Sequence, residues 1–127
     1  MANRMFNQFQ GSLEKGVVQL FAEISFGASG APTLVRGKGI ASVAKASTGV
    51  YTVTLQDTFI RTLGLASTWK GSAAPAGVLV VLAADNVATA NAPTLSLKVL
   101  DEDGVATEPA SGEAVLVAIT LSNSTAL

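Results

Sequence analysis

Apolar and polar side chains alternate strictly near the middle of the chain. The run reads, in order, Tyr51, Thr52, Val53, Thr54, Leu55 and Gln56. A period of two that uses aromatic and β-branched residues predicts a strand with one face in a core and the other toward solvent. Similar alternation recurs at 18–26 and 115–121. The chain is therefore expected to fold from antiparallel sheets that each bury one face.

Further strands follow from the apolar runs that lie between Gly-rich and Pro-rich turns. Together with the central run they are expected at 15–26, 33–36, 39–45, 49–57, 65–70, 78–84, 94–100 and 114–122. The strands at 33–36 and 39–45 are expected to be paired halves around a bend, and 78–84, apolar on both faces, to be central or interfacial. Residues 58–64 suit a helical turn better, with Asp57 and Thr58 as possible caps.

Seven or eight short antiparallel strands at regular spacing indicate an all-β fold. The expected architecture is a β-sandwich or a distorted barrel of the jelly-roll or Greek-key type. We expect residues 14–127 to form a single domain, because 127 residues suffice for one core and no linker interrupts them.

Residues 1–13 have neither a clear strand alternation nor enough length for a helix, and we interpret them as an N-terminal arm. Three apolar side chains, Met5, Phe6 and Phe9, stand out in this polar segment. They either dock on a neighbouring subunit or fold back as a short helical cover over the domain's own core. Both alternatives remain open at the level of sequence.

The chain contains neither Cys nor His. Without these residues it has no thiolate or imidazole for the common zinc sites, Ser-His-Asp triads or Cys-His dyads. We therefore expect a protein that is not an enzyme and that has no cofactor, metal or small-molecule substrate. Charged residues make up 13% of the chain, about half the usual share, so its surface can be covered by neighbours with little desolvation of ions.

Nucleic-acid binding is not expected, since no basic cluster is interleaved with aromatics and the net charge is −1. The longest apolar run, 78–84, is far too short to span a membrane, and the first residues lack the continuous apolar region of a secretory signal. We therefore expect synthesis in a cytoplasm.

Two local patterns could carry a ligand. The acidic run from Asp101 to Asp103, followed by Gly104, resembles the opening of a calcium loop, although the later ligands are missing and a solvated hairpin turn explains it better. Tyr51 and Trp69, each the only residue of its kind, could form a sugar-stacking platform. A lone Trp on a strand more often anchors a core.

Three longer segments together resemble a known group of proteins. They are GVYTVTLQDTF at 49–59, ADNVATANAPTLSLKVLDEDGVATEPASGEAVLVAITLSNST at 84–125, and the first 35 residues, MANRMFNQFQGSLEKGVVQLFAEISFGASGAPTLV. They are similar to small structural proteins encoded beside the major capsid protein in short-tailed bacteriophages. Here Glu108 takes the place of Asp in a D-P-A-S-G-like turn before the last strand.

Within that group, the chain most resembles a capsid decoration, or cement, protein. The resemblance implies a virion protein on the outer surface of the head, where it binds the major capsid protein and bridges neighbouring capsomers. It also implies self-association as a dimer or trimer. The expected contact residues are Met5, Phe6 and Phe9 in the arm and Thr52, Thr54 and Gln56 on the polar strand face. The alternatives are a tail or neck component of the phage, or a carbohydrate-binding β-sandwich module.

Overall fold

The structure is a computed structural model that describes residues 16–71, 79–89 and 93–123. Nearly all regular structure in these residues is β. The strands are β1 (Val17–Phe26), β2 (Pro32–Gly37), β3 (Ile40–Ser47), β4 (Val50–Leu55), β5 (Arg61–Lys70), β6 (Leu79–Asn86), β7 (Thr94–Leu100) and β8 (Ala114–Ser122). A short 3-10 turn, η1 (Ala28–Gly30), joins β1 to β2.

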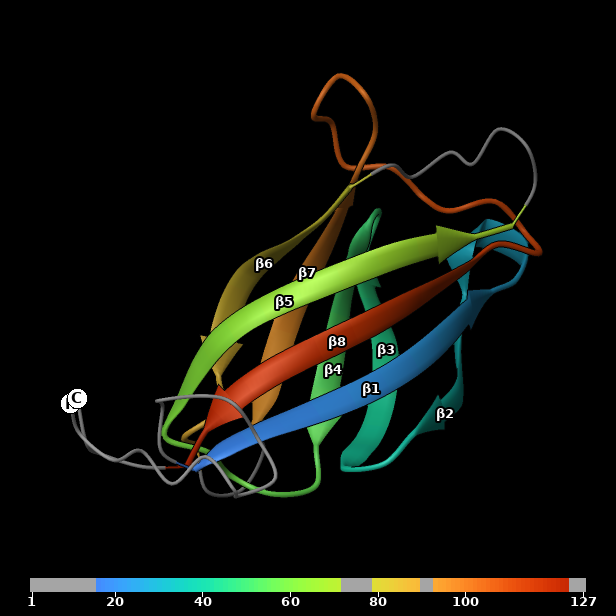
Figure 1. Cartoon of the computed structure of the whole chain (residues 1–127). Coiled ribbons are helices and arrows are strands. Elements are labelled where there is room, and N and C mark those ends of the chain that lie inside the picture. Colours follow the sequence, from blue (N-terminus) through green and yellow to red (C-terminus); the bar gives the residue numbers. More distant parts are fainter. Residues whose placement is uncertain (1–15, 72–78, 90–92, 124–127) are drawn as a thin grey trace, which may run out of the picture.

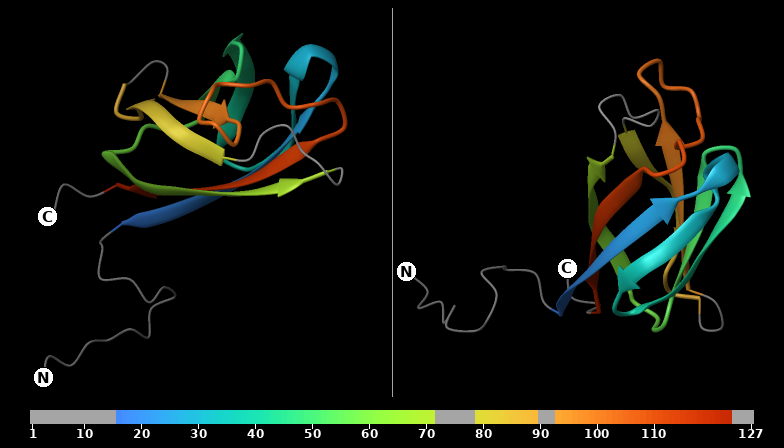
Figure 2. Two further views of the ribbon diagram at one scale, coloured as in Figure 1. Left: turned by 90° about the horizontal axis from the view of Figure 1, so that it is seen from above. Right: turned by 90° about the vertical axis from the view of Figure 1, so that its right-hand side faces the viewer.

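The strands form two antiparallel four-stranded sheets. Sheet A has the order β2-β1-β8-β5, and sheet B has the order β3-β4-β7-β6. The sheets face each other as two layers (Figures 1 and 2). This arrangement confirms the prediction of an all-β sandwich. The first and last strands lie side by side in the middle of sheet A, where β1 pairs with β8 from Val17 to Ser25.

The core lies between the two sheets and is built by the alternation seen in the sequence. Tyr51, Val53 and Leu55 of β4 are each no more than 2% exposed, as that pattern predicts. They pack with inward-facing side chains of the other strands. These include Ala22, Ile24, Phe26, Leu95, Leu97, Val99, Val115, Val117, Ile119 and Leu121.

The helical turn expected at 58–64 is wrong. Residues 57–60 form an irregular connection from sheet B to sheet A, and β5 already begins at Arg61. The backbone N–H of Phe59 donates to the Val87 carbonyl at 2.8 Å, and that of Ile60 donates to the Ser122 carbonyl at 2.9 Å. Because these donors bond to residues far along the chain, no helical turn forms. The buried Phe59 ring packs into the core at this connection.

One other expectation about strand placement is wrong, and a second is wrong in one of its two alternatives. The residues around Gly37 to Gly39 do not join paired strand halves, because β2 and β3 belong to different sheets. Of the run at 78–84, residues 79–84 belong to β6, which is an edge strand of sheet B, so the central alternative is wrong and the interfacial one stays a prediction. Its apolar side chains divide between the core, where Val80 lies, and solvent, where Leu79 is half exposed.

Candidate contact faces

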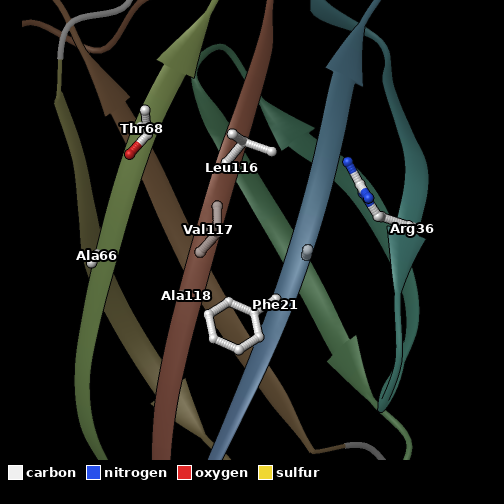
Figure 3. Close-up of a pocket in the computed structure, with 8 residues that line it drawn as sticks. Phe21, Arg36, Ala66, Thr68, Leu116, Val117 and Ala118 are labelled. Atoms are coloured by element: carbon white, nitrogen blue, oxygen red, sulfur yellow. The ribbon is translucent and has the colours of Figure 1, made fainter.

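The outer face of sheet A carries an apolar surface at its centre. Phe21 of β1 stands opposite Ala118 of β8, which in turn stands opposite Ala66 of β5. Leu116 lies two residues along β8 on the same face. Phe21 belongs to β1, which pairs with a strand on each side, yet it is 63% exposed. We call the surface formed by Phe21, Ala66, Thr68, Leu116 and Ala118 the Phe21 face (Figure 3).

Two shallow hollows adjoin the Phe21 ring. One extends toward β5 and is lined by Ala66, Thr68, Leu116 and Ala118, and also by Arg36 of β2. The other lies toward β2 and is lined by Gln19, Arg36, Gly37 and Lys38. The face therefore presents an exposed aromatic ring beside two hollows, a shape suited to interdigitating with apolar side chains of a partner.

A network of charged side chains borders this surface. Glu23 of β1 accepts hydrogen bonds from Arg36 of β2 at 2.8 and 3.2 Å and from Lys70 of β5 at 3.1 Å. The Glu23 side chain is 9% exposed, whereas its two partners are mostly exposed. The carboxylate thus links the two edge strands of sheet A across its outer face. The hydrogen bonds from Arg36, and next those from Lys70, hold the pKa of Glu23 below its ordinary value of 4.5.

This network predicts a pH dependence of stability. Because the pKa of Glu23 is lower in the folded chain than in the unfolded one, its stabilising effect is fully present above about pH 4.5 and is lost as the pH falls through the folded pKa. Glu23→Gln should therefore unfold at lower urea concentration than the wild type at pH 7, and the gap should narrow toward pH 3. Glu102→Gln, in an exposed turn, is the control and should match the wild type at both pH values. A gap that stays equal at pH 3 would contradict the prediction.

The outer face of sheet B is different in chemistry. Thr52 and Thr54 of β4 stand opposite Ala44 and Ser42 of β3 and opposite Ser96 and Thr94 of β7. Lys98 of β7 stands opposite Val50 and is a charged residue of this face. The face consists largely of small, weakly polar side chains, and we call it the Thr face.

The residues expected to bind a partner fall into three groups. Thr52 and Thr54 lie together on the Thr face and are half-buried. Gln56 is exposed just beyond the end of β4, where its backbone N–H donates to the Gly39 carbonyl at 2.9 Å. Met5, Phe6 and Phe9 lie outside the described residues.

Tyr51 and Trp69 do not form a platform for a sugar. Both pack against Phe26, with ring centroids 5.2 and 6.0 Å from it. Tyr51 is 2% exposed and its hydroxyl donates to the Gly30 carbonyl at 2.8 Å. Burial, and next the negative charge of Glu108, raise the Tyr51 pKa to about 12. A ring enclosed in this way cannot offer its face to a ligand.

The acidic run after β7 forms a turn closed by its own hydrogen bonds. One oxygen of the Asp101 carboxylate accepts the backbone N–H groups of Asp103 and Val105, both at 2.9 Å. Gly104 completes the turn with a φ of +79°. In the part of the chain that the structure describes, no three Asp, Glu, His or Cys side chains gather closely enough to hold a metal ion.

Sequence reasoning missed the Phe21 face, although the sequence contained a signal for it. The polar face of the first strand includes Phe21, which is out of place among Gln19, Glu23 and Ser25. The last strand likewise carries Leu116 and Ala118 between its core residues. An aromatic residue on a nominally polar strand face, beside a strand that is apolar on both faces, indicates a second covered surface.

These observations define a β-sandwich whose two unlike outer faces are its candidate sites for contact with other molecules. Within the described residues, no helix is long and apolar enough to cross a membrane. Comparisons with protein-family models, with curated proteins and with solved structures found no match to this chain.

Proposed function

We propose that this chain is a capsid decoration protein of a tailed bacteriophage. It binds the outer surface of the head, in contact with the major capsid protein, and stabilises the contacts between neighbouring subunits of the shell. It is made in the host cytoplasm and resides on the virion. The proposal starts from the resemblance of residues 1–35, 49–59 and 84–125 to virion structural proteins.

The Phe21 face is the observation that best supports a binding role. Large apolar side chains at the centre of an interface, surrounded by polar groups, contribute most of the binding free energy in protein complexes. Phe21 has this setting, with Arg36, Glu23 and Lys70 at the border. Glu23 already pairs with both Arg36 and Lys70. A partner that covers the face therefore does not bury an unpaired charge, which would be costly. We assign the Phe21 face as the principal surface that contacts the shell.

The Thr face is the second proposed contact surface. Its Thr52 and Thr54 side chains can exchange hydrogen bonds with a neighbouring subunit, and Gln56 extends the polar surface beyond β4. Such side chains contribute less to affinity than a desolvated aromatic ring. In a symmetric shell, modest contacts at several faces add through multivalency. Self-association as a dimer or trimer would place both kinds of face at repeating positions.

The shell-binding proposal predicts a large effect of Phe21→Lys. A lysine at this position puts a charge at the centre of the contact, and the affinity for purified undecorated heads should fall at least about 30-fold. Cosedimentation with purified heads measures this affinity. The matched control is Val105→Lys, which adds the same charge at a 60% exposed position in the turn after β7, outside both proposed contact faces, and should reduce affinity less than about fivefold. Near-ultraviolet circular dichroism of the partly buried Trp69 checks that each variant is folded.

Two results would contradict the proposal at different levels. If the wild-type chain neither binds heads nor occurs in virions, the proposed function is wrong. If Val105→Lys weakens binding as much as Phe21→Lys does, the assignment of the Phe21 face is wrong. Copy number separates a head protein from a tail or neck component, because shell symmetry gives hundreds of copies of a decoration protein. Quantitative mass spectrometry against the major capsid protein measures that number.

A further inference from the structure

Within the described residues, the Phe21 face exposes an aromatic side chain to solvent. Phe21 is 63% exposed, and its side chain lines two hollows. Removing such apolar surface from water is favourable, so a segment of matching chemistry that can reach the face will tend to cover it. The residues that precede Gly16 provide such a segment.

The described chain begins at the end of sheet A, close to this face. The backbone N–H of Asn123 donates to the Gly16 carbonyl at 3.0 Å, which holds Gly16 beside the end of β8. Gly16 has a φ of +63°. Glycine adopts this left-handed conformation without strain, and it allows the chain to change direction sharply just before β1. Figure 1 shows β1 starting at this end of the sheet and running along β8.

The preceding residues have suitable length and chemistry. Phe21 lies five residues after Gly16, about 17 Å along an extended strand. Phe9 lies seven residues before Gly16, within about 23 Å, and Phe6 lies ten residues before it, within about 33 Å. An arm that reverses at Gly16 can therefore place both aromatic side chains over the Phe21 face with slack. Two phenylalanines are thus available for two hollows.

We propose that residues 1–15 fold back over the Phe21 face of their own chain and dock Phe6 and Phe9 beside Phe21. The arm of the same chain is favoured over that of a second copy, because a short tether gives an effective concentration in the millimolar range. A further step rests on the proposed function: the docked arm occupies the surface that the shell would bind. The major capsid protein then has to displace the arm, so the docked arm lowers the affinity of the Phe21 face for the shell.

Disulfide formation tests the docking directly, because the chain has no cysteine of its own. In the full chain, Gln8→Cys is combined with Ala66→Cys, which lies in the hollow toward β5. The control combines Gln8→Cys with Thr52→Cys on the opposite sheet. Under mild oxidation at low micromolar concentration, the first pair should form an intrachain disulfide at least about tenfold faster than the control. Equal rates, or a disulfide-linked dimer as the main product, would overturn the proposal.

A second pair of changes tests the role of the aromatic side chains. Adding Phe6→Ser and Phe9→Ser to the Gln8→Cys and Ala66→Cys chain should lower the rate of disulfide formation to that of the control pair. The Trp69 dichroism should not change, because this ring packs against Phe26 in the core. An unchanged rate would overturn docking through Phe6 and Phe9.

Binding to heads tests the competition separately. Without introduced cysteines, the chain carrying Phe6→Ser and Phe9→Ser should bind purified heads severalfold more tightly than the wild type. Unchanged or weaker binding would overturn the competition. The disulfide result does not depend on heads, so docking of the arm and shell binding can fail independently.

Discussion

Gly49→Ala should lower the free energy of unfolding by about 3 kcal/mol or more. Gly49 lies in the turn between β3 and β4 with a φ of +71°. A Cβ atom there would stand 2.8 Å from both the backbone N and O of Thr107 and 3.1 Å from the Val99 carbonyl oxygen. These are main-chain atoms, which cannot rotate away as a side chain could. The Gly49 carbonyl also accepts the Val99 N–H at 2.7 Å, so moving the turn breaks that bond.

Gly104→Ala is the matched control for this prediction. Gly104 also has a positive φ, +79°, but a Cβ atom there would meet nothing within 4 Å. Its replacement should cost only the backbone strain, about 1–2 kcal/mol. Urea denaturation followed by Trp69 fluorescence measures both variants. Equal losses at the two glycines would mean that the close approach of the turn to Thr107 does not matter.

The strands that the sequence predicts best are those with clear alternation. The bounds expected for β7 and β8 agree with the structure, and those of β4 agree closely, because each strand needs an unbroken apolar row toward the opposite sheet. The segment at 58–64 lacked such a row. There Phe59 and Ile60 follow local spacing that resembles a helix, while their hydrogen bonds go to Val87 and Ser122.

Strand order could not be predicted from these patterns. Alternation shows which face of a strand is buried but not which strand lies beside it. The placement of β1 next to β8 joins residues about a hundred positions apart. For the same reason, the central alternative for the run at 78–84 is wrong, whereas the interfacial alternative stays a prediction. A strand that is apolar on both faces can also lie at a sheet edge, as β6 does.

The candidate contact surface was only partly predictable. Thr52 and Thr54 were correctly placed on the outer face of their strand, because alternation decides that directly. The Phe21 face needed the register between β1, β8 and β5, which brings Phe21, Ala118 and Ala66 into one row. Likewise, the pairing of Glu23 with Lys70 depends on strands that are distant in sequence. Such juxtapositions appear only once the sheet is assembled.

Leu95→Ala should lower the free energy of unfolding by about 3–5 kcal/mol. Leu95 lies in β7, a central strand of sheet B, opposite Val53 of β4, and it is 0% exposed. Shortening it removes apolar contacts and leaves a cavity that the surrounding strands cannot readily close, because β4 and β6 hold β7 on both sides. Urea denaturation at pH 7, followed by the fluorescence of Trp69, measures the loss.

The control is Leu79→Ala, which deletes the same atoms on the edge strand β6. Leu79 is 50% exposed, so its loss should cost about 1 kcal/mol or less. Both variants delete the same atoms, so the difference between them reports the deeper burial of Leu95 and the cavity left between the sheets. If Leu95→Ala cost no more than Leu79→Ala, the two sheets would be loosely packed. The sandwich could then not hold the Phe21 face as a rigid surface, and its proposed role in binding would lose its structural basis.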